Sequence, residues 1–198
     1  TTLIYRGDCI LRGFDDDMRR ALEAALTDRG VRTIYQTTIS SLAKAGEKVQ
    51  ATFSDGVTAP YDLVMFATGR RANTAGLGLE TAGVKLNDNG SIAVDAYSQS
   101  TTPSIYAVGD VTGRAQLTPV AIREGWYFAE TVYNNNPQKV DLSLIPTAVF
   151  TEPEIGVVGL TEAEAATHGD IDVYLARFRP MQNVLSTRTD RMVMKLIT

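Results

Sequence analysis

The sequence contains one cysteine, Cys9, one histidine, His168, and one tryptophan among its 198 residues. A single cysteine excludes an internal disulfide framework and a thiolate-rich metal site. Metal sites need several such ligands, so we expect no metal here and interpret His168, in "EAEAATHGD", as a solvated residue near the end of a surface helix.

The sequence also lacks long apolar runs and a strong excess of either charge. No stretch approaches the ~20 apolar residues that span a bilayer, and the first five residues are typical of a strand rather than a signal peptide. The net charge of −4 gives no general attraction to nucleic acid or an anionic membrane. With 44% hydrophobic and 21% charged residues, the composition is that of a soluble globular protein with one large domain or two small ones.

The first 70 residues predict an α/β arrangement. Buried strands are expected at 1–5, 31–36 and 61–69. A helix is expected over 14–30, because its first turn is acidic and Gly30 supplies a stop. Between them, 37–57 indicates an antiparallel meander that turns at Asp55-Gly56. This part therefore predicts the later half of a nucleotide-binding α/β unit with a β insertion.

The rest of the chain predicts a different mixture of elements. A long connection is followed by strands at 91–97 and 105–108 and by a helix that starts at Thr118 and ends at "NNNP". From Ile145 the strands "PTAVF", "IGVVGL", "DVYLARF" and "MVMKLIT" and the helix "TEAEAATHG" indicate an α+β segment. The chain begins and ends on a strand, so we expect it to be part of a longer protein.

One stretch, "IYAVGDVTGRAQLTPVA", places an acid between a strand and a helix. Ligands bind at the ends of strands in α/β sheets, and Asp110 can accept hydrogen bonds from two hydroxyls. Gly109 and Gly113 would let the backbone approach a ligand. Thr118 is a good N-cap and Pro119 suits a first turn, so the helix start would stabilise negative charge. A capped helix behind an exposed aspartate is the other interpretation.

Basic residues follow two of the expected strands. Arg6 and Arg12 offer the permanently charged, forked donors that suit the 2′-phosphate of NADPH. In "FATGRRANT", Gly69 permits close approach to a ligand, and Arg70 or Arg71 could face a cofactor. Taken singly, these residues are better interpreted as solvated surface arginines.

Together the stretches "LIYRGDCILRGFD", "VMFATGRRANT", "IYAVGDVTGRAQLTPVAI", "IPTAVFTEPEIGVVGLTEAEA" and "FRPM" resemble the glutathione reductase family. These are the NADPH-dependent, FAD-containing disulfide reductases among the pyridine nucleotide–disulfide oxidoreductases. The resemblance implies an α/β and α+β fold in three parts. Residues 1–72 would be the C-terminal part of a Rossmann-like NADPH domain, 73–145 a central FAD-contacting segment, and 146–198 the start of a dimerisation domain.

The resemblance also implies roles for single residues. Asp110 would hold the ribityl chain of FAD, and backbone at Thr118 would meet the flavin ring. Six residues would contact NADPH: Arg6 and Arg12 at the 2′-phosphate, Gly69 and Arg70 along the site, and Gln116 and Ala148 beside the nicotinamide. The positive start of the helix would stabilise the anionic reduced flavin.

Several parts of such an enzyme are missing from this sequence. It has no GxGxxG motif, no C-x₄-C pair and no histidine in an HPT-like motif, and Cys9 lies in the NADPH loop. We therefore expect no catalytic residue in this chain, which alone would be an inactive cofactor-binding or dimerisation fragment. The parent protein would be a cytoplasmic homodimer that reduces glutathione disulfide and serves cell redox homeostasis, with no nucleic acid or membrane partner.

The disulfide substrate is the more open part of the prediction. Several glutathione reductases have an arginine that contacts glutathione where this chain has Thr131, and trypanothione reductases share much of the pattern. Arg6 and Arg12 argue against an NAD-using lipoamide enzyme.

Overall fold

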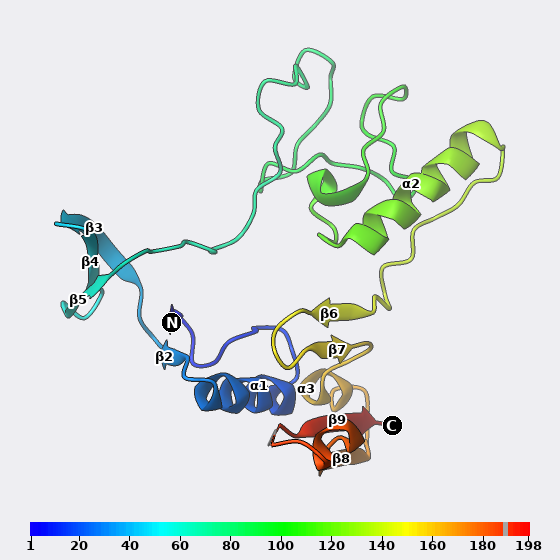
Figure 1. Cartoon of the computed structure of the whole chain (residues 1–198). Helices are drawn as coiled ribbons and strands as arrows, with labels where there is room; N and C mark the ends of the chain where they lie inside the picture. The colour runs from blue at the N-terminus through cyan, green and yellow to red at the C-terminus, as the bar shows by residue number, and fades with distance from the viewer. Residues whose placement is uncertain (188–189) are drawn as a thin grey trace. The chain divides into compact units, whose positions relative to one another are not determined.

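The computed structural model describes residues 1–187 and 190–198 (Figure 1). The chain forms two units, one made of Thr1–Met65 with Pro146–Thr198 and the other of Phe66–Ile145. The functional boundaries expected at 72 and 145 remain predictions, because a division in space does not assign cofactors. Each unit is described by itself below.

The first unit contains the α/β part. Strands β1 (Thr2–Ile4) and β2 (Arg32–Ile34) pair in parallel, and helix α1 (Asp16–Asp28) connects them. The Asp15 carboxylate caps α1 by accepting from the N–H of Asp17 at 3.0 Å, and Gly30 follows the helix with a φ of +78°. The α/β unit predicted from the sequence is confirmed.

The predicted β insertion is a three-stranded antiparallel meander. It consists of β3 (Ile39–Ala45), β4 (Lys48–Phe53) and β5 (Thr58–Tyr61), with β4 in the centre. The second turn lies at Asp55-Gly56 as expected: the Asp55 carboxylate accepts from the N–H of Val57 at 3.0 Å, and Gly56 has a φ of +84°.

The buried strand predicted over 61–69 is wrong. Strand β5 ends at Tyr61, and residues 63–74 have no regular structure. Leu63 and Met65 are each 79% exposed. An apolar run of this kind becomes a buried strand only where neighbouring strands bond its backbone and other elements cover its faces, and the described residues supply neither.

The C-terminal segment confirms all four predicted strands. They are β6 (Thr147–Val149), β7 (Ile155–Val157), β8 (Val173–Phe178) and β9 (Met192–Ile197), paired as two antiparallel hairpins. The expected helix is the single turn α3 (Glu162–Ala165), so the exposed His168 lies beyond it. A second turn, α4 (Met181–Val184), was not predicted.

Two features hold the first unit together. The core joins Cys9, Ile10 and Leu22 to Ile155, so α1 and its preceding loop pack on β7. In addition, the ammonium group of Lys195 on β9 is surrounded by three carboxylates. Asp15 is the N-cap of α1, Asp17 lies in the first turn of α1, and Glu162 is the first residue of α3. The nitrogen is 2.8 Å from Asp15, 2.7 Å from Asp17 and 2.6 Å from Glu162.

The carboxylate cluster shifts the ionisation of its members. Burial alone would lower the pKa of Lys195, but hydrogen bonds to the three carboxylates raise it well above its ordinary value. Burial alone would raise the pKa of Asp15, but Lys195 and the N–H of Glu162 lower it below its ordinary value. Both shifts favour the charged pair.

The second unit consists of a looped segment, the 3₁₀ turn η1 (Gly109–Thr112) and helix α2 (Thr118–Tyr133). Its core contains Val84, Ile92 and Ala107. The strands predicted at 91–97 and 105–108 are wrong: these segments make only single bridges, Leu86 with Ile92, Val94 with Ser100, and Gln99 with Tyr106. Among the described residues, each of these contacts is an isolated bridge, and neither segment joins a continuous strand ladder.

Candidate cofactor-binding sites

The acidic turn of the second unit lies directly before α2. Asp110 is the second residue of η1, and its side chain is 45% exposed. The Nη2 atom of Arg70 lies 3.4 Å from one of its carboxylate oxygens. The structure therefore brings together two predicted site residues that are 40 positions apart in the chain.

The two glycines around Asp110 let the turn pack closely on the chain itself, and the close approach to a ligand expected of them stays a prediction. Gly109 has a φ of +76°, and a Cβ there would lie 3.1 Å from the Cβ of Ala121 on α2. Gly113 has a φ of +68°, and its Cβ would lie 2.8 Å from the Oγ of Ser91. Both glycines thus allow the turn to pack on this chain's own segments, which is a sufficient reason for their presence.

Helix α2 starts without a side-chain cap. Its N-cap is Leu117, so Thr118 is the first helical residue and the predicted Thr118 cap is wrong by one position. Pro119 occupies the first turn as expected, and Gln116 is exposed just before it. An uncapped start presents unpaired N–H groups and a partial positive charge.

These features fit a flavin nucleotide. A half-exposed carboxylate such as Asp110 accepts hydrogen bonds from hydroxyl groups of a sugar-alcohol chain. The first turn of α2, which begins at Thr118, stabilises negative charge on a ring placed against it. The second unit therefore offers an acceptor for the hydroxyl groups of a ribityl chain and N–H donors for a ring.

The basic loop of the first unit follows β1. Arg6 and Arg12 are exposed, and within residues 1–187 and 190–198 their side chains make no hydrogen bond or ion pair. The loop is held instead by Arg19 of α1, which donates to the main-chain carbonyls of Cys9 and Ile10, each at 2.8 Å. Two unpaired guanidinium groups on a fixed loop suit a phosphate monoester.

Arg19 was missed by sequence reasoning, although a signal existed. A cation in the first turns of a helix is unfavourable with the helix dipole. Arg19 occupies such a place in α1, so a tertiary role outweighs its local cost.

Cys9 lies inside this loop and is not a reactive thiol. Its side chain is buried, and its sulfur lies 3.8 Å from a carboxylate oxygen of Glu23. Burial raises the pKa of the Cys9 thiol, with Glu23 adding to the effect and Arg20 opposing it. Burial and Glu23 likewise raise the pKa of the nearby Tyr35 to about 12. A thiol with a raised pKa is a poor nucleophile.

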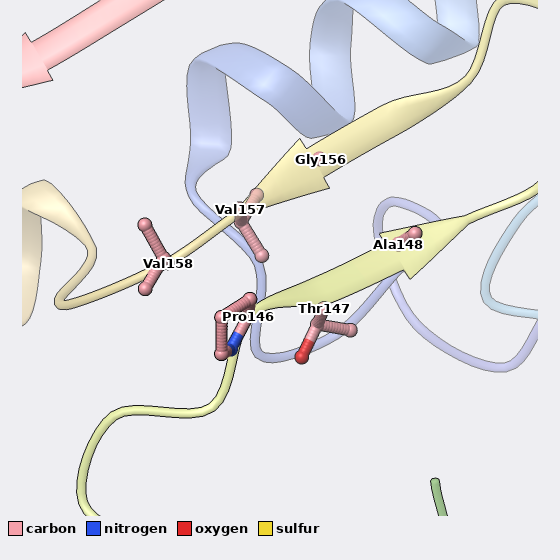
Figure 2. A pocket seen from close by; sticks show the side chains of 6 residues that line it. All are labelled: Pro146, Thr147, Ala148, Gly156, Val157 and Val158. Atoms are coloured by element: carbon pink, nitrogen blue, oxygen red, sulfur yellow. The ribbon is translucent and has the colours of Figure 1, made fainter. Parts of the chain in front are cut away.

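Ala148 lines a shallow hollow on the hairpin formed by β6 and β7. The hollow has a volume of about 400 Å³, and Figure 2 shows the residues around it: Pro146, Thr147, Ala148, Gly156, Val157 and Val158. The lining is almost entirely apolar and the hollow is open to solvent. Its chemistry suits the face of a flat ring, which agrees with the role expected for Ala148 without testing it.

Two family models cover most of the chain. Residues 1–125 match the pyridine nucleotide-disulphide oxidoreductase model, and residues 145–198 match the model of the dimerisation domain of the same enzymes. The chain belongs to this family. Family members use FAD and a nicotinamide nucleotide, so the identification agrees with the flavin chemistry of the acidic turn.

Curated relatives give the same assignment. The chain is 46% identical over 190 residues to the chloroplastic/mitochondrial glutathione reductase of Pisum sativum, covering 95% of this chain and 34% of that protein. It is 42% identical to the glutathione reductase of a Nostoc strain, covering 99% and 46%. It is also 43% identical to the trypanothione reductase of Trypanosoma congolense, covering 100% and 41%. The chain thus spans between a third and a half of these relatives.

Solved structures show the same fold. The HOCl-induced flavoprotein disulfide reductase RclA from Escherichia coli matches with a TM-score of 0.87 and 26% identity, covering 99% of this chain and 45% of that one. In the described part of the chain, no helix is long and apolar enough to cross a membrane. The same residues contain no group of three or more His, Cys, Asp or Glu side chains that could hold a metal ion.

Proposed function

We propose that the protein to which this chain belongs is an NADPH-dependent FAD flavoprotein that reduces glutathione disulfide to glutathione. In this proposal NADPH reduces FAD, FAD reduces a cysteine pair outside this chain, and the resulting thiols reduce the substrate by thiol–disulfide exchange. The acidic turn carries the proposal, because Asp110 and the uncapped start of α2 lie together in a chain of the disulfide reductase family.

The flavin assignment is tested by Asp110→Ala in the full-length protein. Loss of the carboxylate removes an acceptor for a ribityl hydroxyl, so we expect flavin to be lost during gel filtration, as measured by its visible absorbance. Glu154→Ala, at an exposed carboxylate of the other unit, is the matched control and should retain flavin. Full flavin content in Asp110→Ala would leave Asp110 as a residue of the turn only.

Support for glutathione disulfide as the substrate comes from the glutathione reductases of Pisum sativum and a Nostoc strain. The alternative is a trypanothione reductase-like enzyme, which the similar identity to the Trypanosoma congolense protein favours. Thr131, expected where several glutathione reductases have an arginine, lies on α2, and its Oγ accepts from the N–H of Gln138 at 3.0 Å. It offers no charge to a glutathione carboxylate.

Steady-state kinetics with the two disulfides separates these candidates. NADPH oxidation at 340 nm should be faster with glutathione disulfide than with trypanothione disulfide at equal low concentrations. The reverse order would replace the first proposal by the second. The dimerisation-domain match supports a homodimer, which sedimentation of the full-length protein would test. We also propose that the enzyme is cytoplasmic.

A further inference from the structure

Helix α2 buries a charged residue under the acidic turn. The Glu124 side chain is only 1% exposed, because it lies between Ala121 and Phe128 on the inward face of the helix. A buried carboxylate is costly unless partners compensate its charge. The partners of Glu124 therefore indicate why the chain keeps it there.

Both oxygens of Glu124 face the turn that carries Asp110. One accepts a hydrogen bond from the main-chain N–H of Gly109, the residue directly before Asp110. The other lies 2.8 Å from the Nη2 atom of Arg114, whose side chain is also largely buried. Glu124 thus binds the turn at its first residue and just beyond its last.

Arg114 extends the contacts to the rest of the turn. It donates to the Oγ of Ser98 at 2.9 Å and, through Nε, lies 3.4 Å from the Oγ of Thr112. The Thr112 hydroxyl in turn donates to the main-chain carbonyl of Gly109 at 2.8 Å. The N–H and the C=O of Gly109 are therefore both held within one ring of polar contacts.

We propose that Glu124, together with Arg114, is a positioning residue for the flavin-binding carboxylate of Asp110. The pair fixes the N–H of Gly109, and with it the direction in which the next residue presents its side chain beside the start of α2. The proposal rests on the flavin role of Asp110 proposed above. A buried ion pair is often replaceable by apolar residues without loss of stability, so stability alone does not account for it.

The test is the double variant Glu124→Leu with Arg114→Met in the full-length protein. It removes both buried charges together, so the melting temperature should fall by only a few degrees, as expected for one main-chain N–H left without its acceptor. The N–H of Gly109 loses its acceptor, so hydrogen exchange in a peptide that covers the turn should be about tenfold faster, and FAD affinity should fall about tenfold. Retained stability with weakened flavin binding separates positioning from a merely structural role.

Two further variants complete the design. Glu124→Gln keeps an acceptor for Gly109 and should keep more FAD affinity than the double variant, which also gives a test if the double variant does not fold. Glu130→Gln is the matched control, because that carboxylate lies on the same helix and bonds Asn134 and Asn136 at its far end. It should leave exchange in the turn and FAD affinity unchanged.

The outcomes distinguish this proposal from the proposed function. Weak flavin binding in Asp110→Ala with wild-type binding in the double variant would overturn the positioning role alone. Wild-type binding in Asp110→Ala would overturn the flavin assignment of Asp110 and the positioning role with it. Weak binding in both, with faster exchange of the turn in the double variant, supports both.

Discussion

Removing the charge of Lys195 should strongly destabilise the first unit. The Lys195 side chain is 6% exposed and that of Asp15 is 11% exposed, so Lys195→Met leaves a buried carboxylate without its cation. Breaking a buried pair in this way costs about 3–5 kcal/mol. We expect the lower end, about 3 kcal/mol, because the N–H groups of Asp17 and Glu162 still donate to Asp15.

Urea unfolding followed by far-UV circular dichroism measures this effect, and hydrogen exchange of α1 locates it. Lys48→Met is the matched control, because Lys48 also lies on a strand of the first unit and pairs with Asp62 at 3.2 Å, but in an exposed site. That pair should be worth about 1 kcal/mol or less. If Lys195→Met cost no more than Lys48→Met, the cluster would not stabilise the fold as argued.

Three further predictions follow from the same contacts. The pKa of Asp15 is lowered on folding and that of Lys195 is raised, so their contribution is complete between about pH 4 and 10 and is lost as the pH falls through the folded pKa of Asp15. The urea concentration at the unfolding midpoint should therefore decrease as the pH is lowered below 4, and the decrease should be smaller in Lys195→Met. Arg6→Ala with Arg12→Ala should reduce the preference of the full-length protein for NADPH over NADH, each contact being worth about 1.5–3 kcal/mol in steady-state kinetics; an unchanged preference would contradict the assignment. The isolated 198-residue chain should not oxidise NADPH with glutathione disulfide, because the buried Cys9 cannot form an intramolecular disulfide; turnover above a blank without protein would contradict this.

Elements with local signals could be predicted from the sequence. The acidic start at Asp15 and the stop at Gly30 bracket α1, and the Asp55-Gly56 turn lies where expected. The strand predicted over 61–69 is wrong because its formation depends on distant partners rather than on local signals. Its apolar composition specifies burial, but only partners elsewhere can provide it, and Met65 remains exposed without them.

The residues that support the sites were harder to predict than the residues of the sites. Glu124 stands on the inward face of α2, where a charge conflicts with the apolar pattern, and Arg19 conflicts with the dipole of α1. Each conflict is visible in the sequence, but its resolution is a hydrogen bond to main-chain atoms of a separate segment. Sequence patterns describe side chains and do not show which carbonyl or N–H will face them.

The start of α2 shows how a one-residue difference changes the chemistry. With Thr118 as N-cap, its hydroxyl would satisfy an N–H of the first turn, and the helix end would be partly neutralised. With Leu117 in that position, no side chain does so, and Pro119 removes one donor without supplying an acceptor. The remaining N–H groups point out of the helix beside the turn of Asp110. The carboxylate accepts hydrogen bonds, and the open helix start beside it donates them. A ligand with hydroxyl groups at one end and an electron-accepting ring at the other requires both.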